Sequence, residues 1–298
     1  MNGRFGPTAV FSFAPIVVIA AAAKLPTLRL RKSQRNKFSF YLRCCENSLN
    51  PNEFGAALDL EYFSAIVSTL EFLRGNPDGI HHSVKKIERL PAPSELSWCL
   101  EGAPLVDFCG LSDVEHVTSL YLVECRKLTS FRGIAKRLPK LKALWVYSCD
   151  QLNTLDGLQY LKELQALTIW PSFSGKIKVD TFLPLSGSTS LSTLIFSGNV
   201  SDGSLKPLWG LKLLHRLFLS NNFSWQEFAQ FEAQRPDVNF PWKGGVVYNA
   251  NPAILTCPSC GKPQALLTGK GIRLCCPDCD ADRLAKHIKR YTELSRNS

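Results

Sequence analysis

Residues 117–125 read Val-Thr-Ser-Leu-Tyr-Leu-Val-Glu-Cys, and residues 141–149 read Leu-Lys-Ala-Leu-Trp-Val-Tyr-Ser-Cys. Three later segments follow the same template, beginning at Leu164, Leu191 and Leu214. The start-to-start spacings are 24, 23, 27 and 23 residues. Such a period indicates stacked units that bury a continuous core only as neighbours. Each template predicts a strand in which alternate residues, such as Leu120 and Leu122, point into that core.

This template, L-x-x-L-x-L-x-x-N/C, resembles that of leucine-rich-repeat proteins. The resemblance covers residues 117–225, a little over a third of the chain, and implies a solenoid with parallel strands on its concave face. It also implies that this face binds a protein or peptide, without naming the ligand. The last template position, where the chain leaves the strand, is occupied by a small residue that we expect to serve the scaffold: Cys125, Cys149, Asn199 and Asn222.

The segments that return the chain to the next strand also repeat. They read Phe131-Arg-Gly-Ile134, Leu155-Asp-Gly-Leu158 and Leu208-Trp-Gly-Leu211. The third repeat departs from the template, because Pro171-Ser-Phe-Ser-Gly175 replaces its turn and the unit is longer. We therefore expect an extended loop in that repeat.

Template positions three, five and seven are predicted to lie on the concave face, away from the core. Five aromatic residues and one arginine occupy them, and we take these as candidate partner-binding residues: Tyr121, Trp145, Tyr147, Trp170, Arg216 and Phe218. Large apolar side chains on the solvent side of a sheet usually mark an interaction site. The alternative is that another part of the same chain covers them.

Residues 51–116 are predicted to form an N-terminal cap, since the first unit of a repeat array would otherwise expose its core. Apolar residues within Glu53–Arg74 recur at helical spacing, so we expect a helix there. Val114 and Val117 are candidates for the start of a degenerate first strand.

Four cysteines near the C-terminus form two C-x-x-C pairs, Cys257/Cys260 and Cys276/Cys279, with fifteen residues between the pairs. This arrangement is typical of a structural zinc site, and the segment resembles a zinc ribbon. Two short strands are expected at 265–268 and 272–274, joined by a turn at 269–271. Four protein ligands leave no open coordination position, so Zn²⁺ is expected to be structural.

The role of this module has two interpretations. A helix is expected over Asp282–Leu294, with Leu284, Ile288 and Tyr291 on one face. In the first interpretation this apolar face packs against the solenoid, and the module caps the solenoid's open end or serves as an adaptor. Alternatively, a basic set of residues binds nucleic acid: Lys262, Lys270, Arg273, Arg283, Lys286, Lys289 and Arg290.

The net charge of +10 is concentrated at the N-terminus, where residues 1–45 carry eight Lys/Arg and no Asp/Glu. Residues 46–116 carry a net charge of −8. Residues 1–50 are interpreted as a disordered extension or as a targeting segment, and residues 1–43 as an anchor if the protein is membrane-tethered. The eleven cysteines show no regular disulfide spacing, which favours a reducing compartment. We therefore expect a cytoplasmic protein, with organelle targeting or membrane tethering as the alternative.

The chain contains no phosphate-binding loop, dinucleotide-binding glycine motif, nucleophile elbow or H-E-x-x-H motif. The sequence thus predicts a non-enzymatic α/β protein in four parts: an extension (1–50), an N-terminal helical cap (51–116), a short leucine-rich-repeat solenoid (117–240), and a zinc ribbon with a C-terminal helix (241–298).

Overall fold

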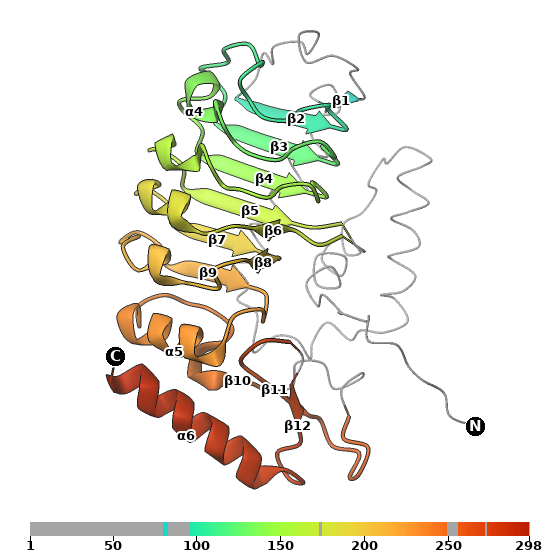
Figure 1. Ribbon diagram of the computed structural model, residues 1–298, viewed down its shortest axis with the longest axis vertical. Coiled ribbons are helices and arrows are strands. Elements are labelled where there is room, and N and C mark those ends of the chain that lie inside the picture. The colour runs from blue at the N-terminus through green and yellow to red at the C-terminus, as the bar shows by residue number, and fades with distance from the viewer. Residues whose placement is uncertain (1–79, 83–95, 173–174, 249–255, 272, 298) are drawn as a thin grey trace, which may run out of the picture. The chain divides into compact units, whose positions relative to one another are not determined.

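The computed structural model describes residues 80–82, 96–172, 175–248, 256–271 and 273–297. All of them lie in the compact unit Asn76–Ser298. The main feature is a seven-stranded parallel sheet in the order β1-β2-β3-β4-β5-β7-β9, and Figure 1 shows these strands stacked in one column. The strands are β1 (Ile80–His82), β2 (Ser97–Glu101), β3 (Ser119–Val123), β4 (Ala143–Tyr147), β5 (Ala166–Trp170), β7 (Thr193–Phe196) and β9 (Arg216–Leu219).

The register of this sheet follows the repeat template. Leu120 pairs with Leu144, and the line continues through the leucine at the same template position in each later strand. All five of these leucines are buried: Leu120, Leu144, Leu167, Leu194 and Leu217. The strand predicted in each of the five templates is therefore present, in an α/β architecture consistent with a leucine-rich-repeat solenoid.

The sheet begins earlier than the sequence template does. Strand β2 contributes Trp98 and Leu100 to the core, and β1 pairs with β2 in parallel. The suggestion that Val114 and Val117 start the first strand was wrong: both are buried in the connection between β2 and β3. The helix expected over Glu53–Arg74 and the extension 1–50 lie outside the described residues.

Short helical segments return the chain from β3, β4, β5 and β7 to the next strand of the main sheet, on the other side of the core from that sheet (Figure 1). They are α4 (Ile134–Arg137), η3 (Leu158–Tyr160), η4 (Leu183–Gly187) and η5 (Lys206–Leu208). The third return motif predicted from the sequence, Leu208-Trp-Gly-Leu211, begins three residues later than the segment that is structurally equivalent to Leu155-Asp-Gly-Leu158. The Leu158 amide donates to the Leu155 carbonyl, and the equivalent bond joins Leu208 to Leu205, so Pro207 occupies the position of Gly157.

The long third repeat contains an additional short strand, β6 (Lys178–Val179), which pairs in parallel with β8 (Asn199–Val200) of the fourth repeat. Asn199 was expected in the inward turn position, but its side chain is exposed in β8. The Asn222 side chain instead donates to the Gly198 carbonyl at 2.9 Å, as the template predicts for its own repeat.

The chain ends in α5 (Trp225–Gln234), η6 (Lys243–Gly245), an antiparallel sheet of β10 (Val246–Val247), β11 (Ala265–Leu267) and β12 (Leu274–Cys275), and α6 (Ala281–Asn297). The two strands and the helix predicted for the zinc ribbon are present, and β10 adds a strand that was not expected. Helix α6 packs against α5 (Figure 1). Within the residues described above, no helix combines the length and the apolar character that a membrane crossing requires.

Candidate functional site

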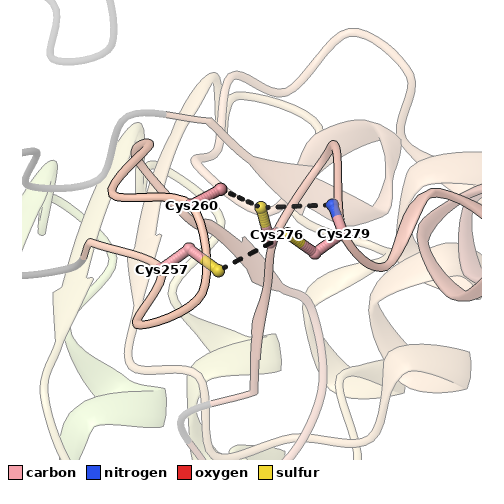
Figure 2. A group of neighbouring side chains, drawn as sticks. All are labelled: Cys257, Cys260, Cys276 and Cys279. Atoms are coloured by element: carbon pink, nitrogen blue, oxygen red, sulfur yellow. Dashed lines mark hydrogen bonds between the residues drawn. The ribbon is translucent and has the colours of Figure 1, made fainter.

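The structure brings the four predicted cysteines together, as Figure 2 shows. Their Sγ atoms all lie within 4.8 Å of one another. Cys257 Sγ lies 3.8 Å from Cys279 Sγ, and Cys260 Sγ lies 3.5 Å from Cys276 Sγ. The donor set is therefore four sulfurs and no carboxylate, which suits a soft ion such as Zn²⁺ and leaves no open position for catalysis.

Each C-x-x-C pair is held by a tight turn. In the first, the Gly261 amide donates to the Cys257 carbonyl at 2.8 Å, and Gly261 has a φ of 71°, in the left-handed region that glycine adopts without strain. In the second, the Asp280 amide donates to the Cys276 carbonyl, and the Cys279 amide donates to Cys276 Sγ at 3.4 Å. The turns thus present both pairs of sulfurs to one point.

Hydrogen bonds within the cysteine cluster shift the pKa values of its thiols in opposite directions. Backbone amides of Ser259 and Cys260 stabilise the Cys257 thiolate and lower its pKa to about 7. Hydrogen bonds from Cys279 to Cys260 and Cys276 stabilise its thiol and raise its pKa to about 12. A divalent cation bound among these sulfurs would favour the thiolate form of all four cysteines, because cysteine ligates metals as a thiolate.

Cys275, the neighbour of a predicted ligand, lies outside the sulfur cluster. It is buried in β12, where it pairs with Ala265, and its sulfur contacts the Asp280 carbonyl at 3.7 Å. Burial raises the pKa of the Cys275 thiol. Only Cys276, the first residue after β12, joins the sulfur cluster.

The hairpin between the two cysteine pairs is fixed to the last repeat by Asn221. The Asn221 Nδ2 donates to the carbonyls of Leu267 and Gly271, each at 3.0 Å, and its Oδ1 accepts from the Gly269 amide at 2.8 Å. The Gly271 amide donates to the Asn221 carbonyl at 2.9 Å. One side chain of the repeat array thus binds both ends of the hairpin turn.

A second set of contacts joins α6 to the end of the array. Tyr291 is fully buried, and its hydroxyl contacts Glu232 Oε2 at 3.0 Å and the Trp242 carbonyl at 3.1 Å. Trp242 Nε1 in turn donates to the Leu219 carbonyl of β9 at 2.6 Å. His287 Nε2 donates to the Gly245 carbonyl at 2.9 Å. The terminal module, residues 241–298, therefore shares its core with the last strand of the sheet.

Burial lowers the pKa of His287, and the nearby charges of Arg273, Arg283 and Arg290 lower it further. The ordinary histidine pKa is 6.5, so below that pH the imidazole of His287 is protonated more readily in the unfolded chain than in the folded one. The folded state is therefore destabilised as the pH falls through this range. We expect the melting temperature to fall between pH 7 and pH 5 by less in the H287Q variant than in the parent protein. Glutamine can still donate to Gly245, and equal losses in thermal scans of the two proteins would contradict this role.

The candidate partner-binding residues lie on the face of the sheet opposite the buried leucines. In the register of the sheet, Tyr121 pairs with Trp145 and Tyr147 pairs with Trp170. The ring centroids of Tyr121 and Trp145 are 6.2 Å apart, and those of Trp170 and Phe218 are 6.0 Å apart. Tyr147 is the most open of the five aromatics, with 37% exposure.

Two of these residues were expected to be more open. Trp170 is only 7% exposed, and its ring packs against that of Phe218, which comes from the second strand along the sheet. Arg216 is half-buried at the start of β9. The face is therefore a packed aromatic ladder more than a row of separate exposed rings.

The two template cysteines are scaffold residues, as predicted. Cys125 and Cys149 are fully buried, and the Cys125 thiol donates to the Leu100 carbonyl of the preceding repeat at 3.4 Å. Cys149 contacts the Leu122 carbonyl in the same way at 3.9 Å. Both sulfurs thus satisfy carbonyl groups where the chain leaves the strand.

Asn221 and His287 were not predicted to connect the array to the terminal module, and neither was the contact between the His287 ring and Trp225 of α5. One available signal was the Ser224-x-x-Glu227 spacing, which is typical of a helix N-terminus. Ser224 Oγ does accept from the Glu227 amide, and this cap begins α5. No local pattern could reveal Asn221, because its partners lie 46 to 50 residues later in the chain.

No family model and no curated protein matches this chain. Among solved structures, it is similar to internalin C2 of Listeria monocytogenes, with 25% identity over 41% of this chain and a TM-score of 0.33. It is also similar to an internalin (inlF) of the same organism, with 17% identity over 48% of this chain and a TM-score of 0.28. The matched region spans 53% of each internalin chain. The fold assignment rests on the strand ladder and register described above.

Proposed function

We propose that this protein is a non-enzymatic interaction module, an adaptor or regulator, whose concave face binds a protein or peptide. The supporting observation is the aromatic ladder Tyr121, Trp145, Tyr147, Trp170 and Phe218 on successive strands of one sheet. Aromatic side chains are enriched at interaction hot spots because they bury a large area with few rotatable bonds. Arg216 adds a positive charge beside Phe218 at the β9 end of this face.

The same proposal gives the terminal module a structural role. The four sulfurs would hold Zn²⁺ through Cys257, Cys260, Cys276 and Cys279, and the ion would supply folding energy and no chemistry. The contacts of Asn221 and Tyr291 support a cap that closes the C-terminal end of the array. Because thiolate ligands require a reducing environment, we place the protein in the cytoplasm.

Replacing Trp145 and Tyr147 together with alanine is expected to weaken peptide binding by at least about thirtyfold, or ~2 kcal/mol, the loss typical of hot-spot residues. The measurement selects peptides from a displayed library on the full-length protein and compares their dissociation constants for the parent and variant. The matched control is Tyr160→Ala, which removes an aromatic ring that is 68% exposed on the return segment η3.

The control is expected to bind the selected peptides like the parent protein, and circular dichroism should show both variants folded. Selected peptides that bind the W145A/Y147A variant as tightly as the parent would show that binding occurs elsewhere.

A further inference from the structure

Two aromatic rings meet where the last repeat joins the terminal module. Trp225 begins α5, and His287 lies in the middle of α6. Their ring centroids are 6.2 Å apart with an interplanar angle of 69°, and both side chains are partly exposed. The hairpin between the two cysteine pairs packs beside these two rings, since Gly269 lies against the Trp225 backbone and Cβ. Three separate segments thus build one small aromatic platform.

Positive charges surround this platform. Arg283 and Arg290 lie four residues before and three residues after His287, so the three share one face of α6. Arg273 comes from the hairpin, directly before β12. All three arginines are exposed, and their charges act on His287. Lys286 adds a further exposed cation on the same helix.

These cations are not neutralised by neighbouring carboxylates. In the described part of the chain, Arg273, Arg283, Lys286 and Arg290 form no ion pair, whereas Lys289 pairs with Glu293 at 3.9 Å. The Glu232 carboxylate is committed to the Gly244 amide and the Tyr291 hydroxyl. Asp280 Oδ2 accepts from the Cys276 amide at 3.3 Å, inside the zinc module. The platform therefore faces solvent with a positive rim.

We propose that this junction binds single-stranded nucleic acid, with a base stacked at the Trp225–His287 platform and phosphates held by Arg273, Arg283 and Arg290. A base can stack on a side chain only where its face is not already covered by neighbouring bases of a duplex, and single-strand binding sites combine aromatic platforms with cationic grooves. Arginine suits the phosphate role because its guanidinium makes bidentate hydrogen bonds to phosphate.

An anionic membrane surface fits the same charges less well. Amphipathic helices that bind membranes expose an apolar face beside the cations. The apolar face of α6 is instead turned inward, since Leu284 and Tyr291 are buried and Ile288 packs against the cluster that contains Leu284. The large apolar side chains that are exposed in the described segments all lie outside α6.

The test uses the full-length, zinc-loaded protein and fluorescein-labelled twelve-nucleotide oligouridylate and oligothymidylate, measured by fluorescence anisotropy over a salt series. The R283Q/R290Q variant should bind on the order of tenfold more weakly than the parent. Its slope of log affinity against log salt should be smaller by about 1.4, or ~0.7 for each lost phosphate contact. The control K136Q/K140Q removes the same charge from two exposed lysines near α4 and should bind like the parent.

A second pair of variants separates stacking from charge. W225L should lose on the order of tenfold in affinity with an unchanged salt slope, because leucine cannot stack on a base, and W225Y should retain most of the affinity. Equal binding by R283Q/R290Q and K136Q/K140Q would overturn the proposal. So would equal affinity for a duplex of the same length, or binding to anionic phosphatidylserine vesicles without binding to either oligonucleotide.

Discussion

Replacing Cys276 with serine is expected to unfold the terminal module and to lower the stability of the whole repeat array. A structural zinc ion contributes on the order of 10 kcal/mol to the folding of a small module, and one lost thiolate removes much of that. The loss should reach the array, because Asn221 and Trp242 connect the module to β9 and to the turn that follows it. The measurement is the free energy of unfolding in urea, followed by tryptophan fluorescence.

The neighbouring Cys275→Ser variant is the matched control. It makes the same chemical change in a buried thiol that lies outside the sulfur cluster. We expect it to cost about 1–3 kcal/mol, the penalty of burying a poorly paired hydroxyl, and to retain the bound metal. A larger loss of stability for Cys275→Ser than for Cys276→Ser would show that Cys275, and not Cys276, is the metal ligand.

Replacing Gly157 with alanine is expected to destabilise the protein by at least about 3 kcal/mol. Gly157 has a φ of 109°, a conformation that a residue with a Cβ adopts only under strain. An added Cβ would also lie 2.0 Å from the Phe131 carbonyl oxygen in the preceding return segment. The stacked backbone would have to move, since the Phe131 amide is itself bonded to the Asp156 carbonyl at 2.9 Å.

Gly210 provides the control, because it lies in a later return segment and a Cβ there would meet nothing within 4 Å. Its φ lies outside the strained region, so Gly210→Ala should change the free energy of unfolding by less than about 1 kcal/mol. Urea denaturation of the two variants decides the matter: similar losses at both positions would mean that the stacked return segments tolerate movement.

The return segments that contain these two glycines also show which parts of the fold the sequence predicts and which it does not. The leucine template predicts the five strands β3, β4, β5, β7 and β9, because burial of one face forces a strict alternation within each strand. The return segments obey a weaker rule, since Gly157 directly precedes η3 whereas the equivalent Pro207 lies inside η5. Leu208-Trp-Gly-Leu211 therefore resembles Leu155-Asp-Gly-Leu158 in letters while differing from it in register by three residues.

The candidate sites divide in the same way. The cysteine spacing predicts which four thiols meet, because each C-x-x-C pair forms its own local turn. The openness of the aromatic face was overestimated at Trp170, since the ring packs on Phe218 from two strands away. The contacts of Asn221 and the meeting of Trp225 with His287 depend on how the terminal module docks, which is a tertiary outcome that no local pattern contains.

The most direct test of the account combines metal analysis with hydrogen exchange on the full-length protein, before and after zinc is removed by a chelator. We expect one zinc per chain, and faster exchange after its removal in the amides of β9 and α5 as well as in residues 256–280. That result would establish the terminal module as a zinc-dependent cap of the array. Absence of zinc, or faster exchange confined to residues 256–280, would contradict it.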